Sequence, residues 1–283
     1  MNYRDIEKLK LVLGYIVLII AVLLTIAPVV WIITTSFKPS LLTFSIPPRL
    51  LFKPTMESYR MLLLEGHHAF GVNIWRDAKN SLIIAITTTF MCIILGVLAA
   101  YGFSRFKFAG KRALGFFILA TRMLPPIGTT IPMFLLMLKL GLLDTRTGLS
   151  MAHLALNIPF AVWMLRGFMD EIPSDLDEAA MIDGCTRIGA VFRVILPLIA
   201  PGVVATAVFS FLLSWNDFAL ALVLTGRNAR TLPLIVMSFM TEEGIYWGPM
   251  AAAATLIIIP PIIFIIFAQK WIARGLTLGA VKG

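Results

Sequence analysis

The sequence EAAMIDGC occupies residues 178–185, and ILPLIAPG follows at residues 195–202. Both stretches belong to a polar segment, residues 166–201, that lies between long apolar runs. The segment holds six of the chain's 15 acidic residues, namely Asp170, Glu171, Asp175, Asp177, Glu178 and Asp183. A membrane protein that is driven by a soluble partner needs a compact helix on the partner's side of the membrane. This segment has the composition for such a helix.

The local pattern of the segment predicts two short helices joined by a sharp turn. Ser174 is a favourable N-cap, and acidic residues follow in the first turn, where the helix dipole favours negative charge. Gly184 is placed to end this helix, because glycine adopts the left-handed conformation readily. Thr186 then caps a second helix over residues 187–195, which stops before Pro197. On local physics alone, the same pattern also fits an ordinary solvated loop helix.

The composition of the whole chain places the rest of it in a membrane. Of its 283 residues, 59% are hydrophobic and 14% are charged, whereas soluble domains have about a quarter charged residues. A spanning helix needs roughly 20 apolar residues. The predicted fold is all-α, a polytopic membrane protein with six transmembrane helices in one domain, residues 1–283. The expected spans are residues 11–33, 81–104, 113–138, 149–165, 202–225 and 247–269.

The net charge of +9 does not indicate nucleic-acid binding, because the basic residues lie in short loops beside apolar spans. Residues 105–112 carry four basic residues and no acidic one between two spans, which predicts that this loop faces the cytoplasm. Six spans then put both termini in the cytoplasm. The first apolar run, residues 11–37, is too long for a signal-peptide core and predicts an uncleaved first span.

Two ionisable side chains fall inside expected spans, Arg122 in the third and Asp217 in the fifth. Such groups are costly and usually face a cavity or a partner. Together with Trp215 and Asn216, they are candidates for a solute pathway or gate. The alternatives are a structural ion pair or, for Asp217, a position near the outer interface. The two differ in depth by roughly 9 Å if both spans start level, so direct pairing requires tilt or the long reach of arginine.

The residues also predict what the chain does not do by itself. Cys92 and Cys185 are far apart in sequence, which predicts neither a disulfide framework nor a metal site. No residue is a candidate for catalysis. The sequence has no Gly-Lys-Ser/Thr phosphate-binding loop, so we expect no ATP binding and no cofactor on this chain. Any ATP hydrolysis must come from a partner.

Five motifs carry a resemblance to one family of transporters. Glu178-Ala179-Ala180-x-x-Asp183-Gly184, followed by Leu196-Pro197, resembles the EAA loop of ABC-importer permeases. The match extends to the sugar-importer branch of the maltose-transporter type. It includes Asn80-Ser81-Leu82, Arg122-Met123-x-Pro125, Ser214-Trp215-Asn216-Asp217-Phe218 and the C-terminal residues 274–283. That family usually has Glu where Asp217 stands, so this chain keeps the acid with one methylene fewer.

The resemblance implies a type I importer in the cytoplasmic (inner) membrane of a prokaryote. Two permeases form a pseudo-symmetric pore, two cytoplasmic ABC ATPase subunits bind ATP and Mg, and an extracytoplasmic binding protein delivers a carbohydrate or related polyol. The EAA helix would be the coupling helix. Its ATPase-coupling residues would be Glu178, Ala179, Ala180, Asp183, Gly184, Leu196 and Pro197. The C-terminal tail would reach the ATPases, and residues 226–248 would meet the binding protein.

Two other hypotheses are weighed against this interpretation: a self-contained secondary transporter, and a channel or purely structural membrane subunit. A self-contained secondary transporter of small solutes often shows internal repeats with paired broken helices, and none is visible in the sequence. A channel should show a filter motif or ring, and none is visible either.

Overall fold

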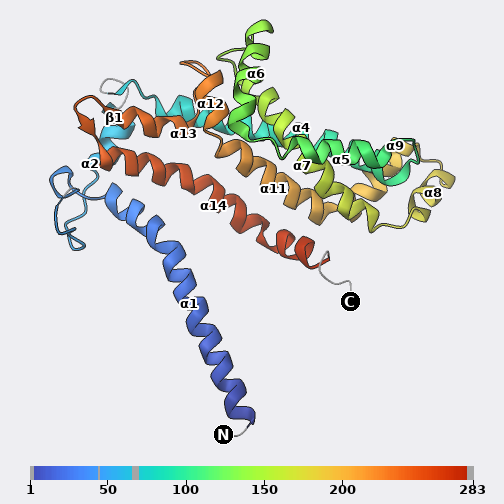
Figure 1. Cartoon of the computed structure of the whole chain (residues 1–283), viewed down its shortest axis with the longest axis horizontal. Coiled ribbons are helices and arrows are strands. Elements are labelled where there is room, and N and C mark those ends of the chain that lie inside the picture. Colours follow the sequence, from blue (N-terminus) through green and yellow to red (C-terminus); the bar gives the residue numbers. More distant parts are fainter. Residues whose placement is uncertain (1–2, 44, 66–69, 279–283) are drawn as a thin grey trace. The chain divides into compact units, whose positions relative to one another are not determined.

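The computed structural model describes residues 3–43, 45–65 and 70–278, and its regular structure is almost entirely helical (Figure 1). The chain divides into two compact units. Unit 1 comprises Met1–Ile74 and Ile235–Ile258, and unit 2 comprises Trp75–Leu234 and Ile259–Gly283. The two units are described separately. The single domain that the sequence predicts stays a prediction.

Unit 1 begins with the 34-residue helix α1 (Tyr3–Ser36). The part Lys10–Ser36 is long and apolar enough to cross a membrane, and its most apolar stretch is not buried within the chain. Leu11 is 61% exposed and Leu24 is 70% exposed. So much exposed apolar surface requires lipid or another protein to cover it.

The other elements of unit 1 are short. They are the 3₁₀ turn η1 (Ser40–Leu42), α2 (Glu57–Arg60), the π turn η2 (Met61–Glu65), the 3₁₀ turn η4 (Val236–Phe239), β1 (Met240–Thr241) and β2 (Gly244–Ile245). The two strands pair antiparallel, with Met240 opposite Ile245. Helix α14 (Trp247–Leu278) starts in unit 1 and ends in unit 2.

Unit 2 contains the remaining helices. They are α4 (Ile74–Arg105), α5 (Lys111–Thr121), α6 (Pro126–Lys139), α7 (Arg146–Asp170), α8 (Asp175–Ile182), α9 (Arg187–Ala190), the π turn η3 (Val191–Ile195), α10 (Leu196–Leu198), α11 (Ala200–Trp215), α12 (Ala219–Leu224) and α13 (Leu232–Ile235). Within this unit, α8 and α9 lie at one end and α12 at the other (Figure 1).

Fewer helices than predicted are long and apolar enough to span a membrane. The described residues contain four, which lie within α1, α4, α7 and α14, and up to five if the bent pair Arg187–Leu198 and Ala200–Trp215 is one span. That pair bends by 85°. The mostly helical, membrane-spanning character of the fold agrees with the prediction, whereas the count of six does not follow from these helices.

The third predicted span, residues 113–138, is not one helix. Helix α5 ends at Thr121, and α6 starts at Pro126. Pro125 is extended, with φ −62° and ψ 129°, and Pro126 occupies the first turn of α6, where its missing N–H costs nothing. The fifth predicted span is also divided, because α11 ends at Trp215 and α12 begins at Ala219.

The predicted stop before Pro197 is wrong, because the helical path continues to Leu198. The π turn η3 ends at Ile195, two residues before Pro197. A proline ring clashes with the carbonyl four residues earlier in a regular helix, and the wider π turn carries the chain out of that regular geometry. The chain therefore bends at Ile199 rather than at Pro197.

A buried apolar cluster fixes the segment that follows the EAA motif. Its members are Val97, Ala100 and Tyr101 from α4, Leu165 and Met169 from α7, and Val191, Ile195 and Ile199 from the chain after α9. Gly202, at the start of α11, allows the ring of Phe168 to lie against the helix, because an added Cβ would collide with that ring. These contacts hold η3 and the start of α11 on α4 and α7.

Candidate functional site

The turn between α8 and α9 has the conformation that the sequence predicts. Gly184 has a φ of +88°, in the left-handed region that glycine enters without strain. The N–H of Cys185 donates to the Ala180 carbonyl at 3.0 Å and closes the end of α8. Thr186 caps α9, since its Oγ1 accepts a hydrogen bond from the Gly189 N–H at 3.1 Å. The helix end at Gly184 and the cap at Thr186 are confirmed.

The predicted cap by the Ser174 side chain is wrong. Ser174 stands at the N-cap position of α8, but its side chain makes no capping hydrogen bond. Its φ of −64° and ψ of −25° are already helical, whereas a capping residue normally has an extended conformation. The Asp177 N–H instead donates to the Ser174 backbone carbonyl at 3.0 Å.

The candidate coupling residues divide by exposure. Glu178, Ala179, Asp183 and Gly184 are exposed, and they form what we call the α8 tip. Ala180 is 6% exposed and faces the packed side of α8. Leu196 is half-buried and Pro197 is exposed, both beyond the π turn η3. The α8 tip is therefore available to a partner, whereas Ala180 packs the helix against the chain.

Exposed apolar side chains flank the α8 tip, and the sequence interpretation did not single them out. Ile182 is 86% exposed, Ile188 is 66% exposed and Phe192 is 45% exposed. Apolar groups next to exposed acids are typical of a surface that binds another protein. The signal in the sequence was the presence of these apolar residues in an otherwise polar segment.

A buried ion pair joins α8 to the end of α4. Nε of Arg105 donates to the Asp177 carboxylate, and the two side chains are 12% and 5% exposed. Arg105 also donates to the Met169 carbonyl at 3.4 Å. Within the described residues, Oδ1 of Asp177 and Nη2 of Arg105 lack hydrogen-bond partners. Sequence reasoning treated Asp177 only as a first-turn acid, because the partner is 72 residues away.

The polar groups in and near the predicted spans form two pairs between α7 and the end of α11. Nε2 of His153 lies 3.1 Å from Oδ2 of Asp217, which makes an ion pair when the ring is protonated. The ring orientation does not make this contact a hydrogen bond. Deeper in the bundle, Nδ2 of Asn157 donates to Oγ of Ser214 at 3.0 Å. Both pairs are largely buried, as polar links between membrane helices usually are.

The other candidates for a solute pathway lie in different surroundings. Arg122 is exposed, and its Nη1 donates to the Leu156 carbonyl of α7 at 3.1 Å. The structure therefore pairs Asp217 with His153 and not with Arg122. Trp215 is 3% exposed and stacks on Phe211, with ring centroids 5.5 Å apart, whereas Asn216 is exposed.

The Asn80-Ser81 motif has a structural role at the opposite end of unit 2 from α8. Nδ2 of Asn80 donates to the carbonyls of Asn228 and Arg230, each at 2.8 Å. Its Oδ1 accepts from Nε of Arg146 at 2.7 Å, and Oγ of Ser81 accepts from the N–H of Leu232 at 2.8 Å. The motif thus ties the loop after α12 to the starts of α4 and α7.

Asp144 also holds the loop after α12. Its carboxylate accepts hydrogen bonds from the N–H groups of Gly226, Asn228 and Ala229 at 2.8–3.1 Å. Partial burial alone would raise the pKa of Asp144, but these backbone donors together lower the pKa below its ordinary value. A depressed pKa means that the stabilisation is complete above the unfolded pKa and is lost only as the pH falls through the folded pKa. The loop is therefore held throughout the neutral range.

The C-terminal motif falls partly outside the structure. Residues 274–278 belong to α14, and residues 279–283 lie outside the described residues. Its expected contact with an ATPase stays a prediction.

Known proteins resemble this chain over nearly its full length. The family model described as binding-protein-dependent transport system inner membrane component matches residues 92–278. The trehalose/maltose transport system permease protein MalG of Thermococcus litoralis is 36% identical over 279 residues, covering 98% of this chain and 99% of that protein. The trehalose transport system permease protein SugB of Mycobacterium tuberculosis is 37% identical, covering 96% and 95%.

A solved structure shows the same fold. It is the crystal structure of a bacterial ABC transporter involved in the import of the acidic polysaccharide alginate. One of its chains superposes with a TM-score of 0.77 and 23% identity, covering 96% of this chain and 99% of that one. At this level of identity, the likeness concerns the fold and not the cargo.

Proposed function

Because the chain belongs to the family of binding-protein-dependent transport system inner membrane components, we propose that it lines, with a second homologous permease, the uptake pathway of an ATP-driven importer. Two ABC ATPase subunits supply ATP hydrolysis, and an extracytoplasmic binding protein supplies the solute. The solute is a carbohydrate or related polyol. The names of two relatives, which refer to trehalose and maltose, support this choice of cargo.

The observation that carries the proposal is that the α8 tip is exposed while α8 itself is anchored to the neighbouring helices. Glu178, Ala179 and Asp183 are exposed, while the buried pair Arg105–Asp177 joins α8 to α4. The apolar cluster around Leu165 packs the chain after α9 on α4 and α7. A helix that transmits force needs both an exposed contact surface and a stiff connection to the membrane helices. We propose that the ATPase binds this tip and moves α4, α7 and α11 through it.

The charge pattern supports the orientation of the chain in the membrane. The segment between α4 and α5, residues 105–112, carries four basic residues and no acidic one, and basic loops of this kind favour the cytoplasm. Arg105 of this segment pairs with Asp177 of α8. The α8 tip then also faces the cytoplasm, and both termini are expected there. The loop after α12, which Asn80 and Asp144 hold at the other end of unit 2, would face the binding protein.

The solute pathway is proposed to pass near Asp217. Its Oδ2 atom caps α12 by accepting a hydrogen bond from the Ala221 N–H at 3.1 Å and lies beside His153. Asp217 thus stands at the break between α11 and α12, next to exposed Asn216. Broken helices inside a membrane are tolerated where the freed groups face protein or a water-filled cavity.

Asp217→Asn is expected to reduce solute uptake roughly fivefold, equivalent to about 1 kcal/mol. The substitution keeps the shape of the side chain but removes the charge beside His153. Basal ATPase activity of the reconstituted complex should stay within about twofold, because the α8 tip lies at the other end of the unit. Asp170→Asn is the matched control, since Asp170 forms a solvated pair with Arg166 and is 47% exposed. Unchanged uptake by Asp217→Asn would favour a purely structural pair.

The cargo is best identified through the partner that carries it. The binding protein that co-purifies with the complex is screened by thermal shift against mono- and disaccharides, sugar alcohols and glycerol phosphates. A sugar or polyol that raises its melting temperature supports the proposal, and this ligand is then used in uptake assays. A binding protein stabilised only by amino acids or metal ions would contradict the proposed cargo.

A further inference from the structure

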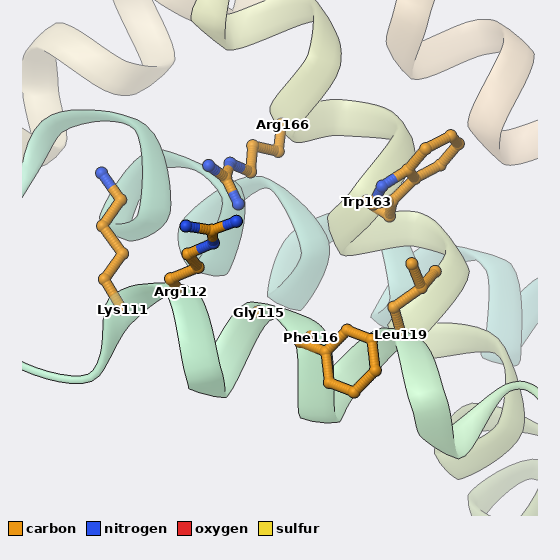
Figure 2. A pocket seen from close by; sticks show the side chains of 7 residues that line it. All are labelled: Lys111, Arg112, Gly115, Phe116, Leu119, Trp163 and Arg166. Atoms are coloured by element: carbon orange, nitrogen blue, oxygen red, sulfur yellow. The ribbon is translucent and has the colours of Figure 1, made fainter.

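An open cavity that is basic on one side and apolar on the other lies between α5 and α7. It has a volume of about 560 Å³ and is lined by Lys111, Arg112, Gly115, Phe116, Leu119, Trp163 and Arg166. Figure 2 shows the three basic side chains at one side of the cavity and Phe116, Leu119 and Trp163 at the other. Neither Asp217 nor any residue of the α8 tip is among the residues that line this cavity.

The basic side of the cavity suits an anion. Lys111 and Arg112 come from the first turn of α5, and Arg166 projects from α7 toward them (Figure 2). None of the described residues that line the cavity is acidic. Arg166 is held in place from behind, because its Nε lies 3.3 Å from Asp170 and its guanidinium lies 5.7 Å from the Phe103 ring. Asp170 thus lies beside one of the three cations, Arg166, and does not line the cavity.

The apolar side of the cavity suits a hydrocarbon chain. Leu119 is seven residues beyond Arg112 in α5, which places it about 10 Å further along the helix axis. Phe116 is 69% exposed and Trp163 is 57% exposed. Tryptophan is enriched at the level of lipid headgroups. The lining thus changes from cationic to apolar over the distance that separates a headgroup from the start of its acyl chains.

We propose that this cavity binds an anionic glycerophospholipid, with the phosphate of its headgroup on Lys111, Arg112 and Arg166 and an acyl chain along Phe116, Leu119 and Trp163. Basic pockets between membrane helices bind anionic headgroups in this way. A zwitterionic lipid fits less well, because its ammonium group would meet cations and no acid among the lining residues. We place this lipid in the cytoplasmic leaflet. That placement rests on the proposed orientation of the chain, whereas the chemistry of the lipid does not.

The test measures fluorescence quenching of Trp163 by brominated lipid, taken as the difference between the wild-type chain and Trp163→Phe. The full chain is reconstituted in vesicles of nine parts phosphatidylcholine and one part phosphatidylglycerol. Bromine is carried by the acyl chains of phosphatidylglycerol in one set and by an equal amount of phosphatidylcholine in the other. The surface charge is thus identical in both sets. Quenching is expected to be at least about threefold stronger with brominated phosphatidylglycerol, because an anion-selective site enriches that lipid.

Two variants distinguish the contribution of the positive charges from that of the open cavity. Lys111→Gln with Arg112→Gln should remove the preference for phosphatidylglycerol, and Gly115→Leu should remove it by filling the cavity while all three cations stay. An added Cβ at Gly115 lies 3.4 Å from Arg166 Nη1, the far end of a flexible side chain, so this variant should fold. Lys139→Gln, a change at an exposed lysine at the end of α6, should keep the preference.

The outcomes distinguish an anionic lipid from a free anion in the cavity, and they need no transport measurement. Equal quenching in both vesicle sets would overturn the proposal, as would a preference that survives in Gly115→Leu. Excess inorganic phosphate should leave the preference unchanged. Loss of the preference in phosphate would identify a site for the free anion and not for the lipid. A failed uptake assay would leave this result untouched.

Discussion

Gly184→Val is expected to lower ATP-driven solute uptake at least about tenfold while the chain remains inserted in the membrane. Gly184 has a φ of +88°, and nothing lies within 4 Å of an added Cβ. The cost therefore comes from the backbone and not from a clash. A left-handed conformation costs an ordinary L-residue roughly 1–2 kcal/mol, and β-branched residues tolerate it least. The turn should rearrange, and the α8 tip should lose its position on the ATPase.

The measurement is ATPase stimulation by the solute-loaded binding protein in the reconstituted complex. Stimulation should be lost in Gly184→Val, and also in Glu178→Lys, which reverses a charge on the exposed tip without touching the turn. Gly167→Val is the matched control, because Gly167 lies in α7 with open space around its Cβ position and no positive φ. Wild-type stimulation in both tip variants would contradict the proposed coupling.

Asp177→Ala is expected to have the second large effect on uptake. It removes the buried ion pair that holds α8 on α4 and leaves the exposed surface of the α8 tip unchanged. The change leaves Arg105 buried at 12% exposure without its carboxylate. Removing one partner of a buried ion pair typically costs about 3–5 kcal/mol. We expect complexes with this variant to be recovered in low yield and to show uptake lowered at least about tenfold.

The control for this prediction is Asp175→Ala. Asp175 lies two residues earlier in the same helix and is exposed, so its loss should change yield and uptake little. The charge exchange that combines Arg105→Asp with Asp177→Arg should restore part of the yield. Equal behaviour of Asp177→Ala and Asp175→Ala would show that the buried pair does not fix α8.

The contrast between Asp177 and Glu178 shows how far the sequence alone could go. Local signals predicted the turn at Gly184 and the cap at Thr186, because both depend on the conformational preferences of single residues. Which acid in the run faces inward depends on Arg105, 72 residues earlier. In the same way, the pairing of Asp217 with His153 joins α7 to the chain after α11. No local pattern contains such long-range contacts.

The breaks within predicted spans have a related explanation. Apolar composition predicts residues 113–138 as one membrane segment, and a proline inside a helix kinks or breaks it. The structure turns that kink into the end of α5 and the start of α6. At Pro197 the error went the other way, because the π turn η3 accommodates the ring and the helix continues. A proline indicates that a regular helix is disturbed. The surrounding residues determine whether the helix ends there or continues through a π turn.

The most direct test of the central claim is cross-linking from the α8 tip to the ATPase in the assembled importer. Cys92 and Cys185, the two native cysteines, are first replaced by serine. Ile182→Cys, at a position that is 86% exposed, is then labelled with a maleimide–benzophenone reagent and irradiated, so that no cysteine is needed on the ATPase. Leu51→Cys, at a position that is 94% exposed in a loop expected outside, is the control. We predict a cross-link to the ATPase subunit from residue 182 and none from residue 51. No cross-link from residue 182, or equal cross-linking from both positions, would contradict the account.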